Sequence, residues 1–122
     1  MARPLLAGGA LAMAVGGALG AVSAHATHGA HHPDAAHLLQ AAVTYHLAHG
    51  IALVIEGALA QVLVTRWLLA AYALHAAGLV LFCGGLWVLA MTGASLGIVI
   101  PTGGLAFIAG WIALAVHAMS KA

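Results

Sequence analysis

The segment from Trp67 to Ser120, WLLAAYALHAAGLVLFCGGLWVLAMTGASLGIVIPTGGLAFIAGWIALAVHAMS, contains no charged residue. A membrane-spanning helix needs about 20 mainly apolar residues, so this segment is too long for a single span. Its natural break is Thr92-Gly93-Ala94-Ser95, where small and polar residues interrupt the apolar run. The segment therefore predicts two spanning helices, over residues 67–91 and 96–119.

The rest of the chain is almost equally poor in charge. Of the 122 residues, 65% are apolar and 4% are charged, whereas a soluble domain carries about 25% charged residues. Apolar blocks over residues 5–24 and 38–64 predict two further spans, and none of the blocks alternates as barrel strands do. We expect an all-α, integral membrane four-helix bundle that forms one domain over residues 1–122.

The few charges also limit function and orientation. Three basic residues cannot neutralise a useful run of phosphates, so nucleic-acid binding is excluded. With four spans, Arg3, Arg66 and Lys121 all fall on one side of the membrane, and Asp34 falls on the other. Because basic residues are enriched in cytoplasmic segments, both termini are expected on the cytoplasmic side.

The N-terminal segment has a second interpretation. Met1-Ala2-Arg3, the apolar stretch that follows and the small residues at Val22-Ser23-Ala24 and Ala24-His25-Ala26 are typical of a cleavable signal peptide. Cleavage would leave three spans and place the C-terminus on the side opposite to that expected from its charge. We therefore favour retention of the first helix.

Histidine is the most unusual residue of the composition, with nine in the chain. Most of them gather around the predicted outer loop, which otherwise carries a single carboxylate. Histidine-rich tracts bind transition metals through neutral imidazole, so zinc or copper are the ions that this loop would hold. The alternative is a hydrated loop without a resident metal, and we expect no other cofactor. The candidate metal ligands are His25, His28, His31, His32, Asp34 and His37.

Two ionisable residues are predicted to meet inside the membrane. Glu56 lies ten residues before Arg66, and His75 lies nine residues after it. At a rise of 1.5 Å per residue, both lie roughly 14–15 Å from the inner boundary. Because the second and third helices form an antiparallel hairpin with almost no loop, we expect Glu56 and His75 to form a buried hydrogen-bonded pair.

Further polar residues follow one face of the second helix. Tyr45, His49 and Glu56 recur at helical spacing, and His46 lies beside them. Such a line is compatible with a proton relay, because imidazole titrates near physiological pH, or with hydrogen bonds that join helices. His49 and His75 would be candidate haem ligands, but their depths are estimated to differ by about 12 Å.

Several segments carry a family resemblance, of which the last is the most specific. They are Ala24-His25-Ala26, Leu39-Gln40-x2-Val43-x-Tyr45-His46-x2-His49-x2-Ala52-Leu53, Gly78-x3-Phe82-x-Gly84-x-Leu86 and Pro101-x-Gly103-Gly104-x2-Phe107-x2-Gly110-Trp111. The chain thereby resembles the family of the domain of unknown function 423, which includes transmembrane protein 256-like proteins. The resemblance implies a four-helix membrane protein without an established activity.

The sequence contains none of the motifs expected of an enzyme, such as a glycine-rich phosphate loop with lysine, so we expect no catalysis. The leading hypothesis is a structural or accessory subunit, or an assembly partner, of a larger membrane complex or homo-oligomer. The alternative is an ion-handling protein that relays protons or binds a transition metal. In either case we expect a multi-pass protein in contact with the lipid bilayer of a bacterial inner membrane.

Overall fold

The computed structural model describes residues 2–120, and the regular structure in that range is entirely helical. Four helical stretches are long and apolar enough to cross a membrane. They are α1 (Arg3–Ala26), which is followed by the short turn η1 (Thr27–Gly29), α2 (Ala35–Leu59), the continuous stretch α3 (Arg66–Gly78), η2 (Leu79–Cys83) and α4 (Gly84–Thr92), and α5 (Val99–Met119). The predicted all-α membrane bundle is confirmed.

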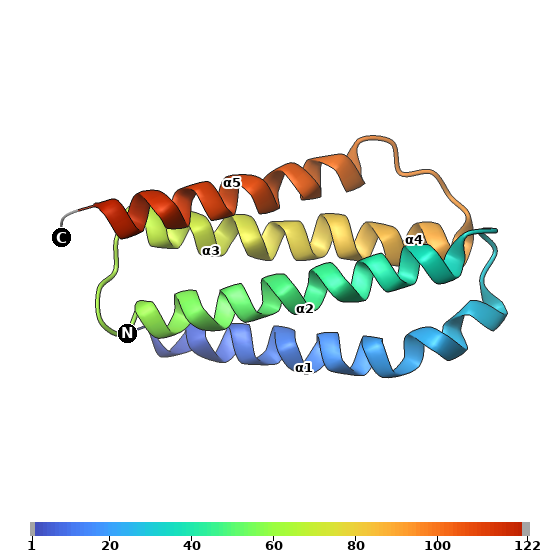
Figure 1. Ribbon diagram of the computed structural model, residues 1–122, viewed down its shortest axis with the longest axis horizontal. Coiled ribbons are helices and arrows are strands. Elements are labelled where there is room, and N and C mark those ends of the chain that lie inside the picture. Colours follow the sequence, from blue (N-terminus) through green and yellow to red (C-terminus); the bar gives the residue numbers. More distant parts are fainter. Residues whose placement is uncertain (1, 121–122) are drawn as a thin grey trace.

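The four spans run lengthwise through the bundle, and α1 packs on α2 while α3 packs on α5 (Figure 1). The start of α1, the α2–α3 connection and the end of α5 lie at one end, and the other two connections lie at the opposite end (Figure 1). This is the alternation that the sequence predicts for four spans. Lys121 lies outside the described residues, and the cytoplasmic placement of the termini stays a prediction.

The helix boundaries differ from the predicted ones mainly around the α2–α3 connection. α2 ends at Leu59 rather than at residue 64, so the link to α3 spans residues 60–65. Thr65 adopts an extended conformation (φ −122°, ψ 161°), and its hydroxyl accepts a hydrogen bond from the Leu68 amide. A helix cannot continue through a residue in this conformation, because an N-cap residue lies outside the helical region.

The start of α5 also lies later than predicted, at Val99 instead of residue 96. Gly93 and Gly97, in the connection before it, have positive φ angles of 71° and 60°. Glycine populates this left-handed region without a steric penalty, so these two residues reverse the chain direction. Pro101 lies in the first turn of α5, where the missing amide proton is tolerated.

Glycines allow α1 and α2 to pack with their backbones in contact. A Cβ atom on Gly9 would lie 2.6 Å from the Val54 nitrogen, and one on Gly57 would lie 2.5 Å from the Leu6 Cα. Small residues at such positions are typical of helix pairs in membranes, where close backbone approach provides much of the packing energy.

The third span contains a π-helical segment, η2, between α3 and α4. The segment leaves the ribbon continuous (Figure 1) but widens the helix locally. α5 approaches at this point, because a Cβ atom on Gly103 would collide with the backbone nitrogen of Phe82. The side chain of Phe82 therefore lies next to α5, at the site described below.

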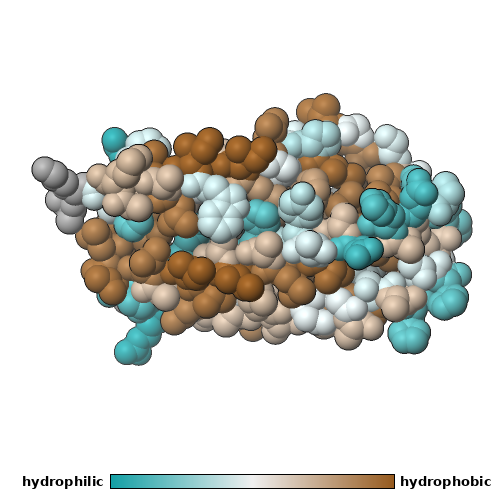
Figure 2. All heavy atoms as spheres, viewed as in Figure 1, coloured by the Kyte–Doolittle hydropathy of each residue, from teal (hydrophilic) through white to brown (hydrophobic). Residues whose placement is uncertain are grey.

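The surface of the bundle is mainly apolar, as Figure 2 shows for one face. Hydrophilic residues gather at the end that carries the α1–α2 and α4–α5 connections, and fewer lie along the middle of the spans (Figures 1 and 2). Many large apolar side chains are exposed, among them Val62, Val80 and Ile98. Lipid is the solvent that such a surface requires.

Candidate functional site

His49 lies near the centre of α2 and is held by two hydrogen bonds. Its Nδ1 lies 2.8 Å from the Tyr45 carbonyl oxygen, and the Trp111 indole nitrogen donates to its Nε2 across 3.0 Å. An indole N–H can only donate, so Nε2 of His49 is the unprotonated acceptor and Nδ1 carries the proton. The two contacts therefore select one neutral tautomer.

Two aromatic rings pack against this histidine. Phe107 stacks on the His49 ring at a centroid distance of 3.6 Å and an interplanar angle of 12°, and Tyr45 lies nearly parallel to it at 6.0 Å. Gly78 makes room for Phe107, because a Cβ atom there would lie 2.5 Å from Cε1 of the ring. The orientation of the imidazole is thus fixed by packing as well as by hydrogen bonds.

The structure places Glu56 and His75 in direct contact. Nδ1 of His75 lies 2.7 Å from Oε1 of Glu56, and both side chains are completely buried. The second atoms of the pair, Oε2 of Glu56 and Nε2 of His75, have no hydrogen-bond partner among residues 2–120. Gly110 brings α5 against this pair, because a Cβ atom on it would lie 2.5 Å from Cδ2 of His75.

The two histidines of α2 and α3 are close neighbours, contrary to the depth estimate from sequence. The ring centroids of His49 and His75 are 5.4 Å apart, and Trp111 contacts both, at 5.8 Å and 4.8 Å. The estimated separation of about 12 Å is wrong because it counted helix up to residue 64, whereas α2 ends at Leu59, and because it ignored the reach of the side chains. Trp111 was given no site role from the sequence, although it is central here.

A groove opens from this cluster toward the surface, between α2, η2 and α5. Its volume is about 610 Å³, and its lining is mainly aromatic and apolar. We call it the aromatic groove; it is lined by Tyr45, His49, Phe82, Pro101, Gly104, Leu105, Phe107, Ile108 and Trp111. Tyr45 and Trp111 are each 45% exposed, so the groove is accessible from the lipid side.

The residues of the predicted polar stripe on α2 do not all face the same neighbouring helix. His46 does not join the aromatic groove, since its Nε2 lies 2.8 Å from the carbonyl oxygen of Ala12 in α1. Two other polar residues also contact a second segment: Tyr72 donates to the Leu5 carbonyl at 2.8 Å, and His117 Nδ1 lies 2.8 Å from the Thr65 hydroxyl. Polar side chains therefore join α2 to α1, α3 to α1, and the start of α3 to α5.

The histidines around the α1–α2 connection are spread out rather than gathered at one point. Nδ1 of His31 lies 2.9 Å from the Met91 carbonyl oxygen, and Nδ1 of His32 accepts from the Asp34 amide at 3.0 Å. Within residues 2–120 there is no group of three histidine, cysteine or carboxylate side chains placed to hold a metal ion. The remaining candidate ligands, His25, His28 and His37, are exposed. The metal site stays a prediction.

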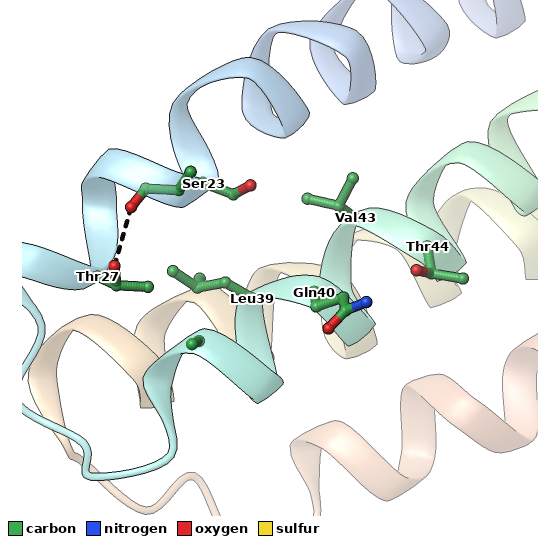
Figure 3. A pocket seen from close by; sticks show the side chains of 8 residues that line it. Ser23, Thr27, Leu39, Gln40, Val43 and Thr44 are labelled. Atoms are coloured by element: carbon green, nitrogen blue, oxygen red, sulfur yellow. Dashed lines mark hydrogen bonds between the residues drawn. The ribbon is translucent and has the colours of Figure 1, made fainter.

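A second hollow lies between the end of α1 and the start of α2. Figure 3 shows its lining, which includes Ser23, Thr27, Gln40 and Thr44, and its volume is about 380 Å³. The two hydroxyls on the α1 side are already used locally, because Thr27 donates to the Ala24 carbonyl and Ser23 to the Gly20 carbonyl, each at 2.9 Å. These two hydroxyl donors are therefore not free to bind a ligand in this hollow.

Four apolar spans around an embedded polar cluster define a multi-pass integral membrane protein. The chain belongs to the family described as "Protein of unknown function (DUF423)", whose profile matches residues 19–104. UPF0382 membrane protein YwdK of Bacillus subtilis (strain 168) is 36% identical over 115 residues, which cover 88% of this chain and 87% of the relative. UPF0382 membrane protein SH2409 of Staphylococcus haemolyticus (strain JCSC1435) is 36% identical over 107 residues, with 87% of each chain covered. No solved structure matches the chain.

These comparisons confirm the family resemblance and the membrane location. The structure adds that three of the segments that carry the resemblance, in α2, η2 and α5, meet in the aromatic groove. Tyr45 and His49 come from the α2 segment and Phe82 from the η2 segment. The second pair, Phe107 and Trp111, comes from the α5 segment. A signal for the second pair was available in the sequence, because residues four apart share one face of a helix.

Proposed function

We propose that this protein is a non-catalytic structural or accessory subunit that associates laterally with another membrane protein. The observation that carries the proposal is the outward face of α1. A stripe at helical spacing on this face consists of small exposed residues, namely Ala7, Ala10, Ala14, Gly17 and Ala21. A Cβ atom on Gly17 would meet nothing within 4 Å, so a partner helix has room to approach the α1 backbone closely, as helices in membranes do.

The hydrogen bonding inside the bundle supports a structural role for the embedded polar residues. Each interhelical contact joins two segments through one or two polar side chains, as in His46 to the Ala12 carbonyl and Trp111 to His49. Such contacts are worth about 0.6 kcal/mol on average in a membrane protein. They stabilise one arrangement of helices and leave the outer faces free for association.

Photo-cross-linking in the native membrane tests the accessory role. A photoreactive amino acid in place of Ala14 should cross-link to a second protein, which mass spectrometry then identifies. The matched control replaces Ile112, which is 60% exposed on α5, and should cross-link to lipid only. Equal protein adducts from both positions, or none from Ala14, would contradict the proposal.

A second candidate function, proton handling, is favoured by the Glu56–His75 pair. Both residues are completely buried inside the spans, and each has one atom without a hydrogen-bond partner among residues 2–120. An unpartnered carboxylate oxygen and ring nitrogen are able to accept or release a proton. Under this candidate function, Glu56→Gln abolishes pH-driven proton flux into liposomes while the protein stays folded. Flux equal to that of protein-free liposomes in the wild type would exclude it.

Metal binding by the outer loop belongs to the same candidate function. Calorimetric titration with zinc or copper should then show tight stoichiometric binding that a His28/His31/His32 triple alanine variant loses. Weak, multiphasic heats that persist in this variant would assign the binding to scattered imidazoles instead.

A further inference from the structure

We propose that the aromatic groove binds a membrane-dissolved planar ring that carries a carbonyl oxygen, a ligand of the quinone class, with the Tyr45 hydroxyl as hydrogen-bond donor. The inference does not rest on the accessory role, because the groove lies on α2 and α5 whereas the small-residue stripe lies on α1.

The first argument is the depth of the groove. Tyr45 follows the start of α2 by ten residues and precedes its end by 14, which places it roughly 15 and 21 Å from the two helix ends. Phe107 and Trp111 flank the middle of α5, which runs from Val99 to Met119. A ligand reaches this position through the hydrocarbon core of the bilayer, so it must be lipid-soluble.

The second argument is the hydrogen-bonding capacity that the groove leaves unused. The nitrogens of His49 and Trp111 bond to each other or to the backbone. The Tyr45 hydroxyl has no hydrogen-bond partner among residues 2–120, and its side chain is 45% exposed where lipid is the solvent. Hydrocarbon cannot accept a hydrogen bond from a hydroxyl group. We therefore expect the ligand to carry a hydrogen-bond acceptor. A carbonyl oxygen provides such an acceptor.

The third argument is the shape and chemistry of the walls. Phe82 lies 4.9 Å from Tyr45 and 5.6 Å from Phe107, at angles of 60° and 64°. Aromatic walls that present both faces and edges favour a planar ring, which gains stacked and edge-on contacts. A volume of about 610 Å³ lies within the range of small-molecule sites. Leu105 and Ile108, at the exposed rim, would contact an apolar tail of the ligand.

Equilibrium dialysis of the full chain in lipid nanodiscs tests the inference, with protein-free nanodiscs as the baseline for partitioning. The probe is 2-methyl-1,4-naphthoquinone, and its matched control is 2-methylnaphthalene, which has the same planar carbon skeleton without carbonyl oxygens. We expect saturable 1:1 binding of the quinone above the baseline, and at least fivefold weaker binding of the hydrocarbon. Equal binding of the two probes would overturn the quinone class, and binding at the baseline level would overturn the site.

Two variants in the groove, and one control variant outside it, test whether the quinone binds there. Gly104→Leu fills the groove from its wall, and a Cβ atom there only touches Phe82 at 3.6 Å, so the fold should persist while binding falls more than tenfold. Gly84→Leu adds the same side chain on α4, outside the groove lining and at a position where a Cβ atom meets nothing within 4 Å, and it should bind as the wild type does. Tyr45→Phe keeps the ring and removes the donor, which should weaken quinone binding about fivefold, the loss of one hydrogen bond. Unchanged binding in Gly104→Leu would overturn the proposal, and unchanged binding in Tyr45→Phe would overturn the donor.

Discussion

The indole of Trp111 donates a hydrogen bond to Nε2 of His49 across 3.0 Å and so joins α5 to α2 near the centre of both helices. The other nitrogen of His49 bonds to the backbone of its own helix, at the Tyr45 carbonyl. The imidazole is therefore anchored on one side and offers a fixed acceptor on the other. Because α2 and α5 are separated by a complete span in the sequence, this bond is a long-range contact that links the two helices directly.

Replacing Trp111 with phenylalanine should lower the free energy of unfolding, because Nε2 of His49 loses its donor in a site without water. An interhelical hydrogen bond in a membrane is worth about 0.6 kcal/mol and at most about 1.7 kcal/mol. A double-mutant cycle that combines Trp111→Phe with His49→Phe should give a coupling energy in this range. The measurement is detergent-induced unfolding in mixed micelles, and a coupling energy of zero would show that the bond does not form.

The Glu56–His75 pair should be the most sensitive polar contact of the bundle. His75→Ala leaves a completely buried carboxyl group without its partner and should destabilise the protein by about 3–5 kcal/mol, as the loss of one member of a buried pair does. Glu56→Gln keeps an oxygen acceptor for Nδ1 of His75 and should cost less. Thermal unfolding in detergent separates the two variants.

Asp34→Asn is the control for these two variants, because Asp34 is exposed in the α1–α2 connection. Its unfolding temperature should equal that of the wild type. If His75→Ala were as stable as the Asp34 variant, the buried pair would have no structural role.

Gly110→Ala should destabilise the contact between α3 and α5. The new methyl group would lie 2.5 Å from Cδ2 and 2.6 Å from Nε2 of His75, which forces either the ring or the helix to move. Overpacking of this kind costs about 1–3 kcal/mol. Gly84→Ala is the matched control, because a Cβ atom on Gly84 would meet nothing within 4 Å. Equal stability of the two variants would mean that α5 tolerates a shift away from His75.

The spans could be predicted from the sequence because the bilayer sets a minimum length for an apolar helix. The residues at which the spans end could not be predicted, since each end depends on the backbone conformation of one or two residues. α2 ends at Leu59, and Thr65 takes an extended conformation that caps α3, so that residues 60–65 form a link outside both helices. Hydropathy does not reveal where α2 ends, because the residues between Leu59 and Thr65, such as Val62 and Leu63, are as apolar as the span itself.

Of the candidate site, only the contact between two helices that follow one another in the sequence could be predicted. Counting residues from Arg66 placed Glu56 and His75 at one depth, where the structure has them in contact. The same counting separated His49 from His75. Counting residues could not predict that Trp111 lies beside them. The rotation of α5 about its axis is set by packing, through Gly103 and Gly110.

The Thr65 hydroxyl should be the contact that stabilises the end of the bundle where α2 connects to α3. It accepts from the Leu68 amide at 3.1 Å and lies 2.8 Å from Nδ1 of His117. Thr65→Ala removes an N-cap, which costs about 1 kcal/mol, and leaves His117 without its partner. Thr65→Ser keeps the hydroxyl and should behave as the wild type does.

The single cysteine provides the measurement for this last prediction. Cys83 is 1% exposed and should react with a maleimide only when the bundle opens. If labelling follows the equilibrium between folded and open protein, a decrease of about 1–2 kcal/mol in the free energy of unfolding raises the labelling rate roughly 5- to 30-fold. Thr65→Ala should show this increase and Thr65→Ser should not. An equal increase in both would mean that the methyl group, which serine lacks, stabilises this end of the bundle instead of the hydroxyl.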